Sequence, residues 1–290
     1  MLARTNRGHK RELITQPGLV DANCMLGTDA AVAALTKRLG IHFGMHSKNV
    51  VDAAIAQVLP GDVDPSGNII GIGTLGNGTV DPVVGLAVQK SGRTSGVTHG
   101  VIAAVEVSIL VTYDKQCGVG SQTAAFLHQI RITPGGFGDF SQGGDSGSIV
   151  VEDTNTCPRA VGLLFAGGGG DTFANPIGPI LSKLKVNTVG CSPTSNAASV
   201  VRAQAMPLQK GGMASSKFLA CKAAKESVET NLLGVAGIVG MGIGVGGSES
   251  NAATVEIYST AEPSEIRSKL PASLTSVPLK IIRTGTIHAL

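Results

Sequence analysis

The chain has 290 residues, enough for one large domain or two modest ones, and its formal net charge is only +3. Aromatic residues make up 3% of it, and no basic stripe is interleaved with them, so the sequence argues against nucleic-acid binding. Forty glycines and many short runs of valine, alanine and isoleucine favour a mainly β protein with tight turns over a helical bundle.

The five cysteines form no Cys-x-x-Cys pair and have no histidine at metal-ligand spacing, so no metal is expected. The glycine-rich stretches lack the context of a phosphate loop or a dinucleotide site, and we expect no cofactor. An odd, scattered set of cysteines predicts mostly free thiols in a reducing compartment, with a Cys117–Cys157 bridge between neighbouring loops as the alternative. No signal peptide and no run of membrane-spanning length is seen, which predicts a cytoplasmic protein away from membranes.

Short apolar runs, cut by glycine, proline and Asn/Asp turns, predict strands through most of residues 13–110. The exception is "DAAVAALTKRLG", residues 29–40, where Val32, Leu35 and Leu39 share one face of a predicted helix. Strands resume over 126–137, 147–153 and 160–170, and "NPIGPILSKLKV" predicts a closing helix. Short strands at roughly ten-residue spacing are typical of a sandwich or of barrels.

The composition then shifts to serine, threonine, asparagine and proline, which predicts a linker over 188–212. The next segment, 213–234, predicts a helix with Phe218, Cys221, Ala224 and Val228 near one face. Strand, strand, short helix and strand follow. The pattern therefore predicts a small α+β domain over 213–290 with a core of its own.

The stretch "GDFSQGGDSGSIVV" holds Ser146 in a turn that leads directly into an apolar strand. A nucleophilic serine needs an exposed hydroxyl and backbone N–H groups directed at the oxyanion that forms during the reaction. Glycines at 143, 144 and 147 let the backbone turn, so that the amides of Gly144 and Ser146 are the candidates for an oxyanion hole. The alternative is an ordinary serine in a β-turn.

Three motifs, "GDSGSIVV", "AVGLLFAG" and "VQKSGRTSGVTHG", together resemble the trypsin/chymotrypsin-like serine proteases, in the bacterial and plant narrow-leaf-type branch. The resemblance spans roughly residues 16–186. It implies a double antiparallel β-barrel over residues 1–187, with a partial first barrel (1–84) and a second barrel (85–187), followed by the linker and the small α+β domain.

The resemblance also implies the site residues. Ser146 is the nucleophile, and Asp52, which opens the apolar stretch "DAAIAQV", matches the aspartate that orients the histidine of the family. Asp29, Asp62 and Asp64 compete with Asp52, but none of them opens an apolar strand. Asp145 matches a structural aspartate beside the nucleophile. The implied substrate pocket, which favours an apolar side chain, is formed by Phe140, Phe165, Ala166 and Gly167.

The catalytic histidine is missing from its expected place. In the family it precedes the aspartate, in a segment whose tail is similar to Met1–Ala3, so it would fall before residue 1. None of the six histidines stands in the expected context, and His9 is the candidate substitute. The small C-terminal domain resembles one that precedes the protease in bacterial relatives, so the chain has the order of a permuted or truncated protease.

These observations predict a serine endopeptidase family member that acts on a peptide or protein substrate and is inactive because its catalytic histidine is absent. A protease fold that serves only as a binding or assembly module is the alternative, and an unrelated β-rich structural protein is a third. Losing the opening strands of the first barrel would expose a sheet edge, which predicts self-association into a homo-oligomer.

Overall fold

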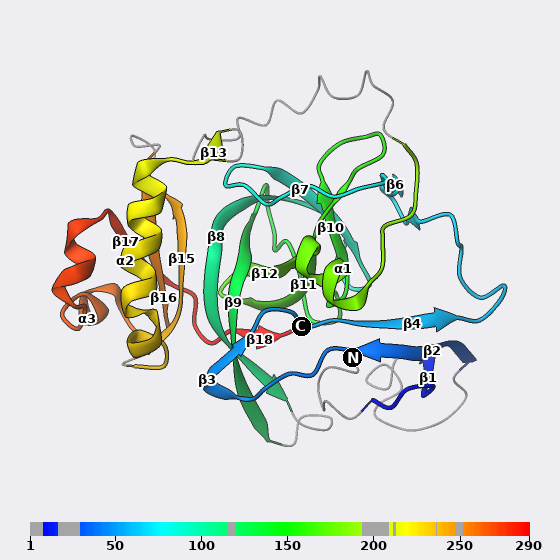
Figure 1. Cartoon of the computed structure of the whole chain (residues 1–290), viewed down its shortest axis with the longest axis horizontal. Coiled ribbons are helices and arrows are strands. Elements are labelled where there is room, and N and C mark those ends of the chain that lie inside the picture. The colour runs from blue at the N-terminus through cyan, green and yellow to red at the C-terminus, as the bar shows by residue number, and fades with distance from the viewer. Residues whose placement is uncertain are drawn as a thin grey trace.

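The structure is a computed structural model that describes residues 8–16, 30–114, 120–192, 209–210, 213–235, 237–246 and 252–290. Its elements are mostly strands, with three α-helices and one short 3₁₀ helix among the described residues. The prediction of a mainly β chain with a small helical part is confirmed. Figure 1 shows the helices α2 and α3 with their strands on one side of the strand-rich body.

The N-terminal part forms a three-stranded antiparallel sheet in the order β1-β2-β4, with a small hairpin beside it. Its strands are β1 (Leu13–Gln16), β2 (Ala30–Arg38), β4 (Ala54–Val58) and the hairpin strands β5 (Asn68–Ile69) and β6 (Gly73–Thr74). The remaining strand of this region, β3 (Gly44–Asn49), pairs in parallel with a strand of the next barrel.

The helix predicted over residues 29–40 is wrong, because this segment contains strand β2. Its backbone pairs with β1 on one edge and with β4 on the other, and Ala33 and Leu35 are buried two residues apart. A spacing of two is that of a strand face, whereas the predicted helix face grouped Val32, Leu35 and Leu39. The pairing partners on both sides override the helical propensity of the alanines.

The second barrel is closed. Its strands follow the order β8-β7-β10-β11-β12-β9, and β9 pairs back with β8, so all six neighbouring pairs are antiparallel. The strands are β7 (Ala87–Gly92), β8 (Gly96–Asp114), β9 (Ser121–Pro134), β10 (Ile149–Glu152), β11 (Ala160–Gly168) and β12 (Asp171–Pro176). Closure leaves this ring without a free edge. The predicted closing helix is present as α1 (Ile177–Leu184) and buries Ile177, Ile180 and Leu184.

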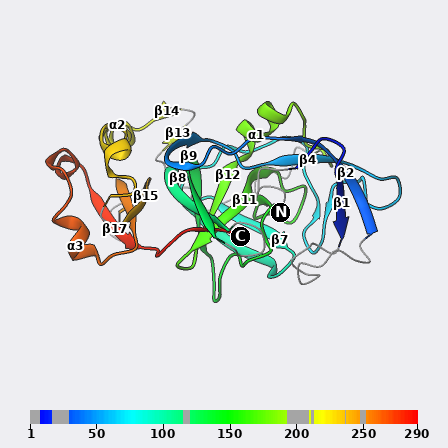
Figure 2. The same cartoon turned by 90° about the horizontal axis from the view of Figure 1, so that it is seen from below.

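The C-terminal module extends the sheet of this barrel. After the short strands β13 (Gln209–Lys210) and β14 (Met213–Ala214) come α2 (Ser216–Leu232), β15 (Ile238–Val245), β16 (Ala253–Ser259), α3 (Pro263–Arg267), the 3₁₀ helix η4 (Ala272–Ser276), β17 (Leu279–Arg283) and β18 (His288–Ala289). Strand β15 pairs antiparallel with β8, and β16 and β17 follow beyond it. Figure 2 shows β15 and β17 beyond β8 from below.

Helix α2 is the helix predicted over residues 213–234. The hydroxyl of Ser215 accepts a hydrogen bond from the Phe218 amide and caps its N-terminus. Phe218, Cys221 and Val228 are buried as expected, and Ala224 is partly buried against the same cluster. That cluster also contains barrel residues such as Val88 and Leu164, so the module shares its hydrophobic core with the barrel instead of having one of its own. The domain boundaries stay a prediction.

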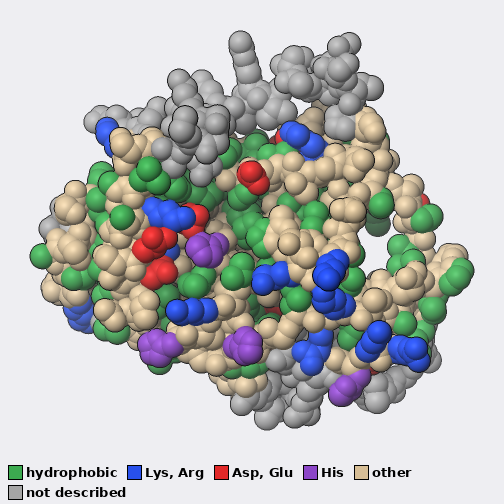
Figure 3. Space-filling view, viewed as in Figure 1, with side chains coloured by type: hydrophobic (Ala, Val, Ile, Leu, Met, Phe, Trp, Pro, Cys, Tyr) green, Lys and Arg blue, Asp and Glu red, His purple; other side chains and the backbone are tan. Residues whose placement is uncertain are grey.

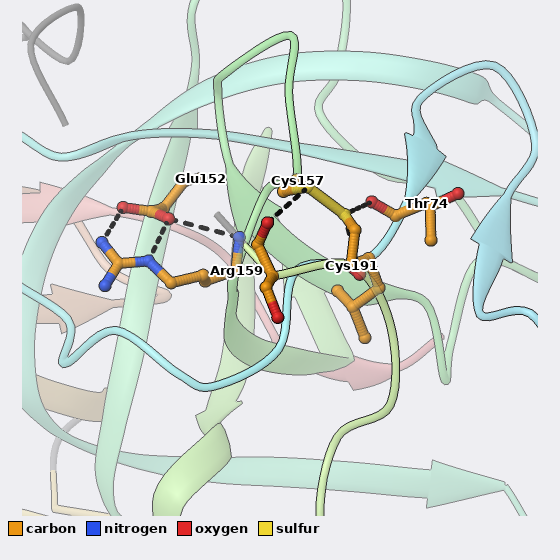
Figure 4. Close-up of a disulfide and its surroundings, with 7 residues drawn as sticks. Thr74, Glu152, Cys157, Arg159 and Cys191 are labelled. Atoms are coloured by element: carbon orange, nitrogen blue, oxygen red, sulfur yellow. Dashed lines mark hydrogen bonds and ion pairs between the residues drawn. A yellow bond between two sulfur atoms is a disulfide. The ribbon is translucent and has the colours of Figure 1, made fainter. Parts of the chain in front are cut away.

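Cys157 forms a disulfide with Cys191 (Figure 4). The alternative of a Cys117–Cys157 bridge is therefore wrong, and so is the expectation of a free thiol at Cys157 and Cys191. The bond joins the β10–β11 loop to the segment after α1, where the Cys191 amide also donates to the carbonyl of Leu75. Cys221 is free and buried, and Cys24 and Cys117 lie outside the described residues.

In the part of the chain that the structure describes, no helix is long and apolar enough to cross a membrane. The cytoplasmic location stays a prediction, and its argument from free thiols no longer holds for the bonded pair.

Candidate active site

Ser146 lies on an exposed turn between β9 and β10. Two glycines of the turn adopt left-handed backbone conformations, Gly144 with φ +101° and Gly147 with φ +88°. At Gly144 a side chain is also excluded by space, because its Cβ would stand 2.5 Å from Oγ1 of Thr94. The Gly147 amide donates to the carbonyl of Leu164, which fixes the turn against β11. The sequence thus holds an exposed hydroxyl on a fixed turn.

Asp145 anchors this turn from inside. Its side chain is buried and lies 3.2 Å from the ammonium group of buried Lys90. It also accepts hydrogen bonds from the Ser95 hydroxyl at 2.5 Å and from the amides of Thr94 at 2.7 Å, Ser95 at 3.1 Å and Gln142 at 3.0 Å. Burial alone would raise the pKa of Asp145, but these hydrogen bonds outweigh it and lower the pKa to about 2. Asp145 therefore stays ionised and supports the turn.

The backbone amides of Gly144 and Ser146 have no acceptor among the described residues. The neighbouring amides of Asp145, Gly147 and Ser148 are all used within the fold, by the carbonyls of Gln142, Leu164 and Asp145. Because Gly144 and Ser146 are also exposed, their N–H groups are available to an external oxygen.

Asp52 lies in the loop between β3 and β4, two residues before β4 of the three-stranded sheet begins. Its amide donates to Oδ1 of Asn175 at 2.9 Å, and its carboxylate accepts a hydrogen bond from the Tyr113 hydroxyl at 2.7 Å. Burial raises the pKa of Asp52, and the hydrogen bond from Tyr113 opposes that rise. Tyr113 and Asn175 both belong to the second barrel, so the barrel holds the Asp52 loop in place although the first sheet is small.

Ser146 and Asp52 line one cavity of about 290 Å³ between the two sheets. The rest of its wall is largely apolar and comes mainly from β1, β2, β4 and β11. Phe165, expected in the substrate pocket, is also on this wall. Arg38 is the one basic residue among the described lining residues, and its Nε donates to the carbonyl of Gly8 at 2.8 Å.

The other expected pocket residues lie elsewhere. Phe140 is buried in the core, where the Lys90 ammonium lies 5.8 Å from the centre of its ring. Ala166 and Gly167 are buried, and strand β18 pairs with both. Ser146, Asp52 and Phe165 therefore line one cavity, and Phe140, Ala166 and Gly167 are not among its described lining residues.

None of the six histidines is among the described residues that line this cavity. His9 is exposed and borders a neighbouring hollow that shares Leu35 and Arg38 with the cavity. His99 and His128 are bound to Asp153 and Glu106, and His288 lies in β18. The amide of His42 donates to Asn49, and His46 lines a separate pocket beside α2.

The sequence did not predict two features of the site. Tyr113, which binds Asp52, is one tyrosine in a long apolar strand, and nothing in its local pattern distinguishes it from a core residue. The contact of residues 288–290 with β11 joins segments more than 120 residues apart. The run of glycines at 167–170 was the available signal that another segment comes close.

No protein-family model matches the chain, and no curated protein matches it. Solved structures of bacterial trypsin/chymotrypsin-like serine proteases resemble it, the family that the sequence motifs indicate. A glutamic acid-specific serine protease is 24% identical, with 55% of this chain and 74% of that one covered and a TM-score of 0.37.

The chymotrypsin of Cellulomonas bogoriensis is 23% identical, with 58% of this chain and 83% of that one covered and a TM-score of 0.38. Protease A of Thermobifida fusca is 24% identical, with 58% and 82% covered and a TM-score of 0.38. Likeness at this level assigns no activity to the chain, so the function has to be argued from the cavity.

Proposed function

We propose that the cavity between the sheets is a serine endopeptidase-type site that lacks its general base. Ser146 is the nucleophile, the amides of Gly144 and Ser146 form the oxyanion hole, and Asp52 is the carboxylate that would orient a histidine. The observation that carries the proposal is that Ser146 and Asp52 line one cavity with no histidine among its described lining residues.

The chemistry needs a base at a defined step. When the Ser146 hydroxyl oxygen attacks a peptide carbonyl carbon, its proton has to move to an acceptor, which later returns a proton to the leaving amine. The Asp52 carboxylate is bound by Tyr113 and faces the cavity without a histidine ring beside it. Without that ring, binding and the oxyanion hole remain, and turnover falls by roughly a millionfold.

A fluorophosphonate probe, which labels activated serines, tests this proposal. We expect no labelling of the 290-residue chain at neutral pH within hours. The Ser146→Ala variant is the control and should give the same blank result. Rapid labelling that disappears in Ser146→Ala would contradict the missing base, and loss of that labelling in His9→Ala would identify His9 as the substitute.

The second candidate is a peptide-binding module that uses the same cavity without catalysis. The apolar lining and the free amides beside Ser146 support it, because both bind a peptide without any proton transfer. Under this candidate Ser146→Ala leaves peptide affinity unchanged, whereas in a turnover enzyme it removes the activity.

A further inference from the structure

Two strands share one edge of β11. On the opposite edge, β12 pairs along the whole of residues 162–168. On the shared edge, β10 pairs with the β11 residues from Ala160 to Leu163. Further along the same edge, β18 pairs with Ala166 and Gly167. Because β12 already occupies the other side, β10 and β18 lie end to end along the same edge.

The junction between the two strands is the Ser146 turn. The Gly147 amide donates to the carbonyl of Leu164 at 2.8 Å, and the Leu290 amide donates to the carbonyl of the next residue, Phe165, at 3.1 Å. Since β18 is antiparallel to β11, the chain direction at Leu290 runs toward Ser146. Residues 288–290 therefore approach the serine in an extended form with the carboxyl end leading.

The backbone of β11 is shaped to accept this segment. A Cβ on Gly167 would stand 3.2 Å from the Leu290 side chain, and one on Gly168 would stand 2.7 Å from the carbonyl oxygen of Thr286. A Cβ on Gly169 would stand 2.5 Å from the carbonyl oxygen of Thr284. Three successive glycines thus permit the close approach of residues 284–290, and any side chain there would displace them.

The segment is also held from its other side. The Thr112 amide of β8 donates to the carbonyl of Ile287 at 2.8 Å, and Ile287 is buried. Leu290 is partly buried against the hydrophobic cluster that contains Phe140 and Leu164. Figures 1 and 2 show the C-terminal segment leaving β17 and ending inside the barrel region beside β11.

We propose that residues 286–290 occupy the peptide-binding edge of this site as the acyl half of a substrate would, and that the site selects extended peptides of this pattern. The selected peptide has leucine next to Ser146, a small residue before it, and a β-branched apolar residue two positions further back. Backbone bonds to β11 supply the affinity, and packing of the leucine against the cluster that contains Phe140 and Leu164 supplies the selectivity. The inference rests on the proposed function for the role of Ser146.

The test is competition between the segment and a free peptide. The probe is fluorescein-labelled Thr-Ile-His-Ala-Leu amide, and binding is read by fluorescence anisotropy to the full chain and to a chain that ends at Gly285. A tethered segment acts at an effective concentration of about millimolar, so we expect the shortened chain to bind the probe at least ~10-fold more tightly. The same peptide with aspartate in place of leucine should bind the shortened chain ~10-fold more weakly.

A second variant covers the case in which the shortened chain does not fold, since the deletion removes buried Ile287. Leu290→Asp keeps the whole chain and weakens the leucine contact, so it should raise probe affinity several-fold. Leu219→Asp, at an exposed position on α2, is the matched control and should bind the probe like the parent chain.

Three outcomes would each overturn the inference. The shortened chain folds but does not bind the probe, the leucine and aspartate peptides bind equally, or Leu290→Asp and Leu219→Asp bind the probe with equal affinity. Ser146→Ala in the shortened chain should retain probe binding. Failure of the proposed function appears as fluorophosphonate labelling, whereas failure of this inference appears as an unchanged anisotropy.

Discussion

At the residue scale, the Ser146 turn depends on a buried ion pair. Asp145 and Lys90 are both inaccessible to solvent, and their carboxylate and ammonium are 3.2 Å apart. Asp145→Asn would leave the buried ammonium without its counterion, and removal of one partner of such a pair costs about 3–5 kcal/mol of unfolding free energy. We expect a loss of this size in urea unfolding at pH 7.

The control for this prediction is the double variant Lys90→Met/Asp145→Asn. Methionine fills much of the lysine volume without a charge, so the double variant should regain a large part of the lost stability. Because the pKa of Asp145 is lowered, its stabilisation is present above its ordinary pKa of 3.8 and is lost as the pH falls toward about 2. Equal stability of the single and double variants would show that the ammonium is not the cause.

Ser146 and Asp52, the two predicted residues that line one cavity, are those whose chemistry is local. The glycines around Ser146 are needed by the turn itself, and Asp52 opens a strand, so a short window identifies both. The positions of Phe140 and Tyr113 relative to the site could not be predicted in this way, because the local sequence around each is that of an ordinary aromatic core residue. Whether such a ring borders a cavity or binds an aspartate depends on strands brought together from distant parts of the chain.

At the scale of elements, β2 shows where the local pattern fails. The alanines of this segment favour a helix by propensity, and the pairing partners on both edges override that preference. Helices α1 and α2 were predictable for the opposite reason, since each has one apolar face at helical spacing and packs on a sheet through it.

A second element-scale feature is the contact between β8, β9 and α2. Oε2 of Glu106 lies 2.5 Å from Nδ1 of His128 on the paired strand, and its Oε1 lies 3.0 Å from the Lys222 ammonium on α2. Figure 3 shows acidic, basic and histidine side chains gathered over this seam. The hydrogen bond with His128 lowers the pKa of Glu106 to about 2, against the effect of burial, and raises the pKa of His128.

The Glu106–His128 pair therefore predicts that its contribution to the free energy of unfolding passes through a maximum as the pH is varied. The Glu106 contribution is present above its ordinary pKa of 4.5 and is lost toward pH 2, and the His128 contribution is present below its ordinary pKa of 6.5 and is lost as the pH rises through its folded value. His128 is half exposed, so His128→Asn should cost only about 0.5 kcal/mol at pH 5.5 and nearly nothing at pH 9.

Asparagine is chosen because residue 128 has φ +61°, a conformation that asparagine tolerates as well as histidine does. His46→Asn, at an exposed position in β3, is the control for replacing a histidine outside this ion pair. Thermal unfolding measured from pH 4 to 9 distinguishes the two. A constant difference between His128→Asn and the parent chain across this range would exclude the ion pair as its cause.

At the scale of the whole molecule, a continuous sheet and a buried ion network are among the contacts that join the barrel and the C-terminal module. Arg131 on β9 binds Glu256 on β16 at 3.0 Å and Asp171 on β12 at 2.9 Å. The Tyr258 hydroxyl donates to the same Glu256 carboxylate at 2.9 Å. Separation of the two parts would break this ion pair and open the hydrophobic core that they share, so the two parts should unfold together.

The seam between β8 and β15 tests this coupling. A Cβ on Gly240 would stand 2.7 Å from the side chains of Ile109 and Tyr258 and 2.9 Å from the carbonyl of Ser108. Gly240→Val should therefore force the two strands apart and cost about 1–3 kcal/mol by overpacking, with backbone strain in addition.

In calorimetry the parent chain should show one transition, and Gly240→Val should show two, because the module then melts before the barrel. Gly136→Val, where a side chain meets open space, is the matched control and should keep one transition. Two separate transitions in the parent chain would instead support an independent α+β domain over residues 213–290.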